Sequence, residues 1–248
     1  MNKVFQVLVM GMMVLGNVQG FAVWDPEMCW MDEDLSCLKE ANFVALKERV
    51  TNELKNSWCS QEKVQLLMDL VRMEKPKVCV EIGAFTGSSV LPVAAALAYS
   101  KQGTIYAIDA WSNDVMVKNL DENDPNRPWW STVDMSSVKQ SFGHLMKKWS
   151  VQQFVHEIAL PSNQAIHQIP EGIDFLHLDG DYSEQGSMQD VEFYVSKVKQ
   201  GGYILLSNLY IMINGKQPKL KAFCALLETC DIVTEIENDN AILFKKII

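Results

Sequence analysis

Two hydrophobic patterns divide the chain after residue 37. Apolar residues recur at helical spacing over residues 38–54 and 64–73, which predicts two helices, the second with Ser60 as its N-cap and Pro76 beyond its end. From residue 77 onward, short runs rich in β-branched residues predict strands that alternate with helical stretches. The predicted strands span residues 77–82, 103–109, 153–158, 173–178, 203–206, 232–237 and 241–247. The predicted helices among them span residues 88–99, 134–149, 188–199 and 218–230.

This alternation predicts an α/β fold. Strands that alternate with helices form a parallel sheet covered on both faces, so we expect a three-layer α/β/α, Rossmann-like, doubly wound sheet of seven strands. The last two predicted strands are joined by a short Asn/Asp turn at residues 238–240, which predicts one antiparallel strand at the sheet edge. Residues 23–75 are expected to form a helical preface, and residues 76–248 the α/β domain.

The first 22 residues are typical of a secretory signal peptide. Lys3 precedes an apolar run over residues 4–16, and small or polar residues continue to Ala22. We therefore expect residues 1–22 to be removed and the protein to be exported, either periplasmic or secreted. Two alternatives stay open at this point: an uncleaved anchor that meets the membrane through residues 4–22, and a buried first helix.

Composition and charge narrow the function classes. Hydrophobic residues make up 48% of the chain, which excludes a disordered protein, and 31 acidic against 22 basic residues give a net charge of −9, which disfavours a nucleic-acid partner. Cys79 and Cys224 lie in predicted core elements. The other four cysteines could pair in an oxidising compartment, with no pairing favoured by the sequence; they are Cys29, Cys37, Cys59 and Cys230.

Glycine and acidic residues follow the first two predicted strands, where ligands of such sheets bind. Gly83 and Gly87 let the backbone turn tightly and approach a ligand, and Glu81 suits an ammonium or a sulfonium better than a diphosphate. Asp109 ends the second strand, close to where an acidic residue accepts both ribose hydroxyls. The pattern predicts a nucleoside site, and it disfavours a dinucleotide-binding dehydrogenase because the third glycine of that motif is missing.

With these motifs the chain resembles class I S-adenosylmethionine-dependent methyltransferases, in particular a small family that carries four motifs in order at strand ends. They are matched here by Glu81-Ile-Gly83-Ala-Phe-Thr-Gly87-Ser-Ser, Ile108-Asp109-Ala-Trp111, Asp179-Gly-Asp-Tyr182 and Gly201-Gly-Tyr-Ile-Leu-Leu-Ser-Asn208. The resemblance implies S-adenosylmethionine as cofactor, with the methionine part near Glu81, the ribose on Asp109 and the adenine flanked by Trp111. The cofactor-binding residues that it implies are Glu81, Gly83, Ala84, Phe85, Gly87, Ser88, Asp109, Ala110, Trp111, Ser162, Asn163 and Asp179.

The resemblance also implies the reacting end of the site. Asp179, Asp181 and Tyr182 are the expected catalytic residues, and in related O-methyltransferases the positions of Asp179 and Asn208 help to hold a divalent cation such as Mg²⁺, which activates the acceptor hydroxyl. Two departures put this in question. Ser207 stands where the family has a second carboxylate, and Tyr182 stands where it has His, a better general base near neutral pH.

The expected reaction is methylation of an oxygen atom on a small-molecule or sugar-like acceptor. Trp129 and Trp130 lie in the polar interval over residues 112–133 and predict either an apolar lid over the acceptor or side chains that fill a gap. His177, inside a strand, is expected to be a core residue, and the other three histidines are expected on the surface. An exported protein that keeps the fold as a nucleoside-binding or interaction module and has lost activity is the alternative. The oligomeric state is not predicted.

Overall fold

The computed structural model describes residues 31–248, with side chains from residue 38 onward. The predicted signal peptide over residues 1–22 lies outside the described residues. Contacts divide the chain into two units, residues 1–41 and residues 42–248, and the second unit holds the sheet and its helices. No helix among the residues described is long and apolar enough to cross a membrane.

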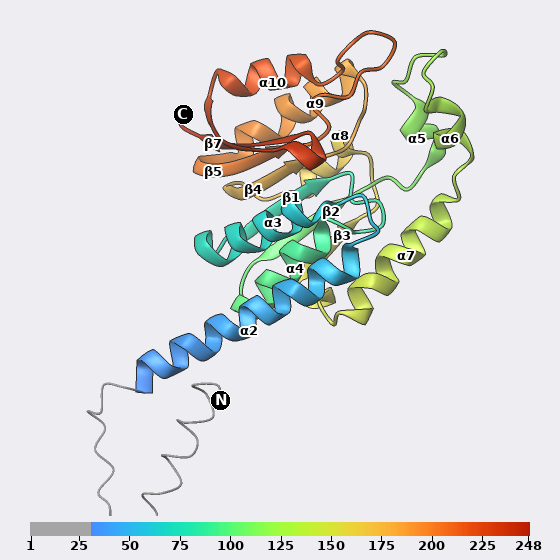
Figure 1. Cartoon of the computed structure of the whole chain (residues 1–248). Helices are drawn as coiled ribbons and strands as arrows, with labels where there is room; N and C mark the ends of the chain where they lie inside the picture. Colours follow the sequence, from blue (N-terminus) through green and yellow to red (C-terminus); the bar gives the residue numbers. More distant parts are fainter. Residues whose placement is uncertain (1–30) are drawn as a thin grey trace, which may run out of the picture. The chain divides into compact units, whose positions relative to one another are not determined.

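The second unit is built on a seven-stranded mixed sheet in the order β3-β2-β1-β4-β5-β7-β6 (Figure 1). The strands are β1 (Val78–Ile82), β2 (Thr104–Ile108), β3 (Val155–Ile158), β4 (Ile173–Leu178), β5 (Val198–Leu206), β6 (Cys230–Ile236) and β7 (Ala241–Lys246). The first five strands pair in parallel, and β7 pairs antiparallel with both β5 and β6. The predicted seven-stranded sheet with antiparallel pairing at one edge is confirmed.

Helices cover both faces of this sheet, as the alternation of elements predicted. One face packs against part of α2 (Met31–Leu54) and against α3 (Gln61–Glu74), α4 (Val90–Ser100) and α7 (Met135–Lys148). The other face packs against α8 (Ser162–Ala165), α9 (Glu184–Tyr194) and α10 (Leu220–Leu227). Because strand side chains alternate between faces, Cys79 of β1 belongs to the first core and its neighbour Val80 to the second.

The start of α3 has the predicted cap. Ser60 has extended backbone angles, and its Oγ accepts a hydrogen bond from the backbone N–H of Lys63. The helix ends before Lys75, which is in the left-handed conformation just ahead of Pro76. This cap places the first turn of α3, with Lys63 in it, beside the carboxyl ends of β4 and β5.

Two sequence predictions about elements were wrong. The predicted helix over residues 188–199 ends at Tyr194, and β5 begins at Val198 rather than at Tyr203, because Val198 already pairs with Ile173 of β4. The interval over residues 112–133 holds two short helices that were not predicted, α5 (Asn113–Val117) and α6 (Arg127–Thr132). The short 3-10 helices are η1 (Gln152–Phe154), η2 (Ile166–Gln168), η3 (Val195–Lys197) and η4 (Glu237–Asp239).

The cysteines of the described side chains are free. Cys79 is buried as expected, whereas Cys224 is exposed on α10. Cys59 and Cys230, two of the four expected to be able to pair, are buried as thiols. Burial raises the pKa of the Cys59 thiol to about 12, so it is a poor nucleophile there. The side chains of Cys29 and Cys37 lie outside the described part.

Candidate active site

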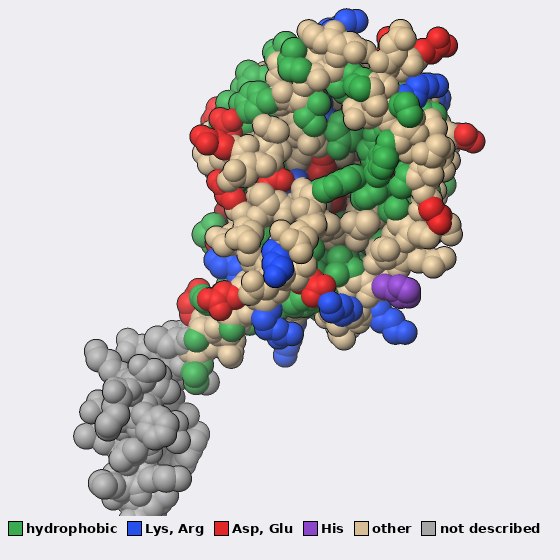
Figure 2. Space-filling model, turned by 45° about the vertical axis from the view of Figure 1, so that its right-hand side comes forward, with side chains coloured by type: hydrophobic (Ala, Val, Ile, Leu, Met, Phe, Trp, Pro, Cys, Tyr) green, Lys and Arg blue, Asp and Glu red, His purple; other side chains and the backbone are tan. Residues whose placement is uncertain are grey.

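A cavity of about 280 Å³ opens beyond the carboxyl ends of the parallel strands. It lies where β1 is flanked by β2 on one side and β4 on the other, the point at which the strand order reverses and where such sheets bind ligands. Figure 2 shows hydrophobic side chains gathered around a hollow, with acidic side chains visible inside it. Most predicted site residues line this cavity: Gly83, Ala84, Phe85, Ser88, Asp109, Ala110, Ser162, Asn163, Asp179, Asp181, Tyr182 and Asn208.

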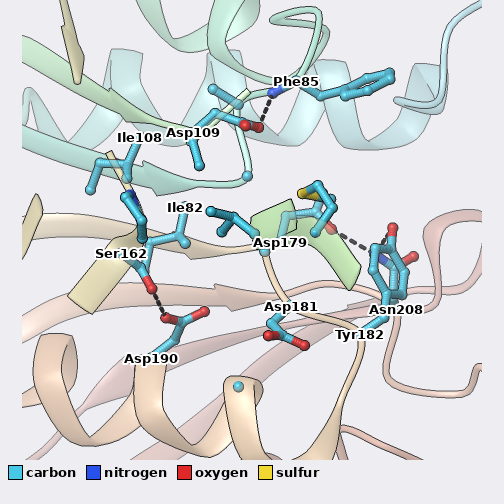
Figure 3. Close-up of a pocket in the computed structure, with 18 of the residues that line it drawn as sticks. Ile82, Phe85, Ile108, Asp109, Ser162, Asp179, Asp181, Tyr182, Asp190 and Asn208 are labelled. Carbon is cyan, nitrogen blue, oxygen red and sulfur yellow. Dashed lines mark hydrogen bonds between the residues drawn. The ribbon is translucent and has the colours of Figure 1, made fainter. Parts of the chain in front are cut away.

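Asp109 organises the loop after β1. One carboxylate oxygen accepts the backbone N–H of Phe85 at 2.9 Å (Figure 3). The other accepts the backbone N–H of Trp111 at 2.7 Å. Both of those residues have positive φ angles, 44° and 43°, a conformation that costs free energy for a residue with a Cβ. Burial raises the pKa of the Asp109 carboxyl, and the two backbone hydrogen bonds reduce this effect without cancelling it. Asp109 therefore holds a strained loop as well as facing the cavity.

Gly83 lets the ends of β1 and β4 come close together. Its φ is 91°, and a Cβ added there would lie 2.5 Å from the backbone oxygen of Asp179. Glycine is thus required by conformation and by space. The close approach brings the Asp179 end of the cavity next to the Asp109 end.

Three residues implied by the resemblance lie outside the cavity lining. Glu81 is fully buried beneath it, where its Oε1 accepts a hydrogen bond from Ser89 Oγ at 2.5 Å. A Cβ on Gly87 would meet Phe142 and Met146 of α7, so this glycine serves helix packing. Trp111, expected beside the adenine, packs on Phe142 and donates its indole N–H to the Phe85 oxygen at 3.0 Å. The ring of Trp111 is buried in the first core and does not line this cavity, so its stacking beside the adenine stays a prediction.

A buried carboxyl group that the sequence did not reveal lies at the far end of the cavity. Asp190 of α9 is 4% exposed, and its Oδ1 accepts a hydrogen bond from Ser162 Oγ at 2.6 Å (Figure 3). Burial raises the pKa of this carboxyl to about 7, a change that the Ser162 hydrogen bond opposes. Ser162 was predicted to contact the adenine edge, and Asp190 is positioned to share that contact.

Asp179, Tyr182 and Asn208 lie together at the opposite end (Figure 3). The side-chain N–H₂ of Asn208 donates to Asp179 Oδ1 at 2.5 Å and to the Tyr182 hydroxyl at 3.3 Å. Burial and the charge of Asp179 raise the pKa of the Tyr182 phenol well above its ordinary value. Tyr182 is therefore a neutral hydrogen-bonding group here and a poor general base.

Asp181 points into the space between these two ends (Figure 3). Its Oδ2 accepts a hydrogen bond from the Asn119 side chain at 2.7 Å, and its Oδ1 accepts the Ser183 backbone N–H at 2.7 Å. The first bond ties the segment after α5 to the end of β4.

Lys63 is the most consequential residue that sequence reasoning missed. Its side chain is 3% exposed, and its ammonium donates to Asp179 Oδ2 at 3.3 Å and to Ser207 Oγ at 3.0 Å, with Asp239 Oδ1 at 3.9 Å. Burial lowers the pKa of this amine, but the charges of Asp179 and Asp239 raise it by more, so that Lys63 stays protonated. A signal was present in the sequence, because Lys63 occupies a core-facing position one turn before Leu67.

The charge of Lys63 also acts on Asp179. Burial alone raises the pKa of the Asp179 carboxyl, yet Lys63 and Lys219 hold it below its ordinary value. Asp179 is therefore a carboxylate at neutral pH, paired with a buried cation.

His177 is fully buried, as predicted, and it links the core to the site. It is the register partner of Glu81 across β1 and β4, so that the two side chains lie on the same face of the sheet. His177 Nδ1 lies 3.3 Å from Glu81 Oε2, and its Nε2 hydrogen-bonds with Ser207 Oγ at 2.9 Å. The other three histidines are exposed, as expected: His144, His156 and His167.

The residues near Asp179 do not fit a divalent cation. Such a cation takes six or more oxygen ligands, and among the side chains described no group of three His, Cys, Asp or Glu residues is arranged to hold one. Asn208 directs its amide nitrogen at Asp179, and the Lys63 ammonium contacts the other Asp179 oxygen. The expected Mg²⁺ site on Asp179 and Asn208 is therefore already filled by protein donors.

Aromatic rings surround the mouth of the cavity. Trp58 stacks on Phe85 with ring centroids 5.0 Å apart and an interplanar angle of 4°, and it is 65% exposed. Trp130 meets Phe85 edge to face at 5.9 Å and lies 6.0 Å from Tyr182. Trp129 contacts Trp58 from outside the cavity at 5.6 Å. Of the two predicted lid residues, Trp130 lines the cavity and Trp129 supports its rim.

Comparison with known proteins places this site in a family. A model of a methyltransferase domain matches residues 80–209, more than half of the chain, and a model of O-methyltransferases matches residues 31–123. No curated protein matches the sequence. The arrangement of motifs at the strand ends agrees with the methyltransferase match.

Solved structures share the fold at low sequence identity. The O-methyltransferase NovP is similar over 85% of this chain and 100% of its own, with a TM-score of 0.64 and 12% identity. The methyltransferase PaMTH1 from Podospora anserina, solved with S-adenosylhomocysteine, is similar over 94% of this chain and 99% of its own, with a TM-score of 0.54 and 16% identity. The O-methyltransferase TomG from Streptomyces achromogenes, involved in tomaymycin synthesis, is similar over 83% of this chain and 89% of its own, with a TM-score of 0.55 and 13% identity. With the family match, the sheet order and the cavity at the switch point, the chain belongs to the class I S-adenosylmethionine-dependent methyltransferase family.

Proposed function

We propose that this methyltransferase moves a methyl group from S-adenosylmethionine to a hydroxyl oxygen of a small molecule that presents an aromatic ring or the apolar face of a sugar beside that hydroxyl. The observation that carries the proposal is the continuous cavity that joins the Asp109 end to the Asp179 end beneath an aromatic rim. The similarity to O-methyltransferases over residues 31–123 supports oxygen as the atom that is methylated.

Residues of this chain suit the ribose and the adenine of the cofactor. Asp109 offers carboxylate oxygens to the ribose hydroxyls, and Ser162 with Asp190 offers polar groups to the adenine edge. Gly83 has no side chain, so the cavity wall between Asp109 and Asp179 stays open. When bound, the cofactor supplies an electrophilic methyl group on a positively charged sulfur, and the carboxylates of Asp179 and Asp181 favour that charge.

The rim suits the acceptor. The rings of Trp58, Phe85 and Trp130 present flat apolar faces, which pack against an aromatic ring or the apolar face of a sugar. Since methyl transfer depends on alignment of the attacking oxygen with the carbon–sulfur bond, a site that holds the acceptor by its ring supplies much of the catalysis. The transfer would balance with the hydroxyl proton taken up by the Asp181 carboxylate on the cavity wall or by solvent water, as the acceptor oxygen gains the methyl group and sulfur keeps the electron pair of its former bond to carbon.

Calorimetric titration with S-adenosylhomocysteine tests the cofactor half. We expect the wild type to bind and Asp109→Ala to lose binding, because the carboxylate and the loop it holds are both removed. Asp114→Ala, on the exposed side of α5, is the matched control and should bind like the wild type. Equal affinity of the wild type and Asp109→Ala would contradict the ribose assignment.

Transfer of a labelled methyl group tests the acceptor half. Simple phenols and catechols form one arm and reducing sugars the other, so that an aromatic acceptor and a sugar-like acceptor are distinguished. Methylation in either arm supports the proposal. Binding of S-adenosylhomocysteine without transfer to any hydroxyl compound would instead indicate the inactive nucleoside-binding module.

A further inference from the structure

The position of Lys63 carries an inference about how the acceptor is held. Its ammonium lies on the cavity wall within hydrogen-bond distance of Asp179 Oδ2 and Ser207 Oγ. These are the two sequence positions at which the resemblance implied carboxylate ligands of a divalent cation. A protein cation therefore stands where the family pattern puts a metal ion.

The net charge of the site agrees with replacement of a divalent cation by the Lys63 ammonium. A site with carboxylates at both positions and a divalent cation has the same net charge as a site with Asp179, the neutral Ser207 and one ammonium. The departure at residue 207 and the buried lysine thus compensate each other. A second cation at this point would be repelled by Lys63, because like charges in contact repel each other strongly in a site of low dielectric.

The ammonium keeps a donor for a ligand. An ammonium group has three N–H donors. Among the described residues, Lys63 donates two hydrogen bonds, one to Asp179 Oδ2 and one to Ser207 Oγ. Asp239 Oδ1, at 3.9 Å, is an ion-pair partner beyond hydrogen-bond distance. The third N–H is therefore available to an oxygen atom in the cavity.

Lys63 is also held firmly in place. Its backbone N–H is bonded to the N-cap Ser60, whose own backbone N–H donates to Asp239 Oδ2 at 3.1 Å. On the far side, Ser207 is fixed by His177. A donor fixed in this way needs no reorganisation when charge develops on the acceptor, which is the condition for electrostatic catalysis.

We propose that the Lys63 ammonium replaces the divalent cation of the family pattern, so that this chain needs no metal ion and holds the acceptor oxygen with a lysine N–H. The inference rests on the proposed methyl transfer to a hydroxyl oxygen. Lys63 is then a catalytic residue that touches the acceptor, and Ser207, His177 and Asp239 are positioning residues that act through it.

Binding of Mn²⁺, followed by electron paramagnetic resonance, tests the metal part on the full-length wild type without any variant. We expect no uptake of Mn²⁺, with or without S-adenosylhomocysteine, and no change in methyl transfer after treatment with EDTA. Uptake of Mn²⁺ that is lost in Asp179→Asn would overturn the inference. Binding of S-adenosylhomocysteine is measured on the same sample, so that failure of the proposed function is seen separately.

Lys63→Met tests the acceptor part, because it keeps an unbranched, mainly apolar side chain and removes the ammonium group. We expect kcat/KM for the acceptor to fall about 100-fold, the scale found when one preorganised donor is removed, with the affinity for S-adenosylhomocysteine unchanged. Lys47→Met is the control, because Lys47 does not line the cavity and its Nζ lies 2.7 Å from Asp69 Oδ1. This variant should keep the wild-type kcat/KM. Wild-type kcat/KM in Lys63→Met would refute the role.

Lys63→Ala gives a second readout that does not depend on activity. Removing the side chain leaves Asp179, Asp239 and Asn208 facing an open space, so we expect this variant to take up Mn²⁺ that the wild type and Lys63→Met do not. Failure of Lys63→Ala to bind Mn²⁺ while it remains folded would show that the space is not equivalent to a cation site, and would count against the exchange.

Discussion

Asp190 is an acidic side chain held inside the protein with little compensation for its charge. Burial raises the pKa of its carboxyl most and the charge of Asp181 raises it further, whereas the Ser162 hydrogen bond and the charge of Lys219 lower it. Its pKa of about 7 compares with 3.8 for an ordinary aspartate. The folded protein therefore keeps a proton that the unfolded chain has lost between about pH 4 and pH 7.

This difference makes stability depend on pH. As pH rises through that interval, the unfolded carboxyl ionises first, so the free energy of unfolding falls and then levels off above about pH 7. Asp190→Asn keeps an acceptor for Ser162 and removes the titration. We expect the variant to be about as stable as the wild type at pH 4 and more stable above pH 7, by up to about 4 kcal/mol at about 1.4 kcal/mol per pH unit. Urea unfolding of both proteins from pH 4 to 8 measures this, and a difference that does not vary with pH would contradict it.

The site residues divide according to whether they directly follow a parallel strand or come from an element that packs against the sheet. Asp109 and Asp179 were predicted because each follows a strand, and the carboxyl ends of parallel strands meet at one edge. Lys63, Asp190 and Asp239 were not predicted, since they come from α3, α9 and the connection between β6 and β7. Their approach to the cavity depends on how those elements pack on the sheet, which no local pattern records.

The turn after β1 is the element on which the two ends of the site depend. Gly83→Ala should strain a backbone with φ of 91° and push a methyl group against the Asp179 oxygen. We expect a loss of about 2–4 kcal/mol, combining the conformational cost with overpacking. Gly172→Ala is the control, because its φ is 80° but a Cβ there would meet no atom within 4 Å, so about 1 kcal/mol is expected. Equal losses in denaturant unfolding would show that the close approach to β4 is unimportant.

The segment that carries α5 and α6 holds the aromatic rim. Asn113 donates from its side chain to the backbone oxygens of Trp130 at 2.8 Å and Val133 at 2.9 Å, which ties the C-terminal half of α6 to the start of α5. Asn113→Ala should loosen Trp130 and raise KM for the acceptor about tenfold, while binding of S-adenosylhomocysteine stays the same. Ser131→Ala removes an exposed hydroxyl of the same helix and should leave KM unchanged. A similar rise in both variants would point to general loss of α6 instead.

The elements of this segment also show where sequence patterns stop being informative. The strands and long helices have enough residues for a clear period, and their order was predicted correctly. Helices α5 and α6 have five and six residues, too few for a period, and they are held by side-chain bonds such as that of Asn113. The early start of β5 has a similar cause, because pairing of Val198 with Ile173 overrides the local preference of residues 195–199 for helix.

For the protein as a whole, cofactor binding and folding are linked. S-adenosylhomocysteine contacts are expected from β1, β2, β3 and β4 loops at once, so the ligand should bind the folded chain and not the unfolded one. At a concentration 100 times its Kd it should add about 2.7 kcal/mol to the free energy of unfolding, which raises Tm by about 5–10 °C for a domain of this size. Asp109→Ala should show no such rise. A rise in Asp109→Ala equal to that of the wild type would place the ligand elsewhere.

We propose that residues 1–22 direct export and are then removed, which would set the compartment in which the reaction takes place. The support is the order of Lys3, the apolar run over residues 4–16 and the small residues up to Ala22. Expression of the full chain in a bacterial host, with mass spectrometry of the intact protein, should give a mature chain that begins at Phe21 or Val23. Replacing Leu8 by Arg, which interrupts the apolar run, should leave the full-length chain inside the cell. An unprocessed wild-type chain in the membrane fraction would instead support the anchor, and S-adenosylmethionine would then have to be available on the side of the membrane where the cavity lies.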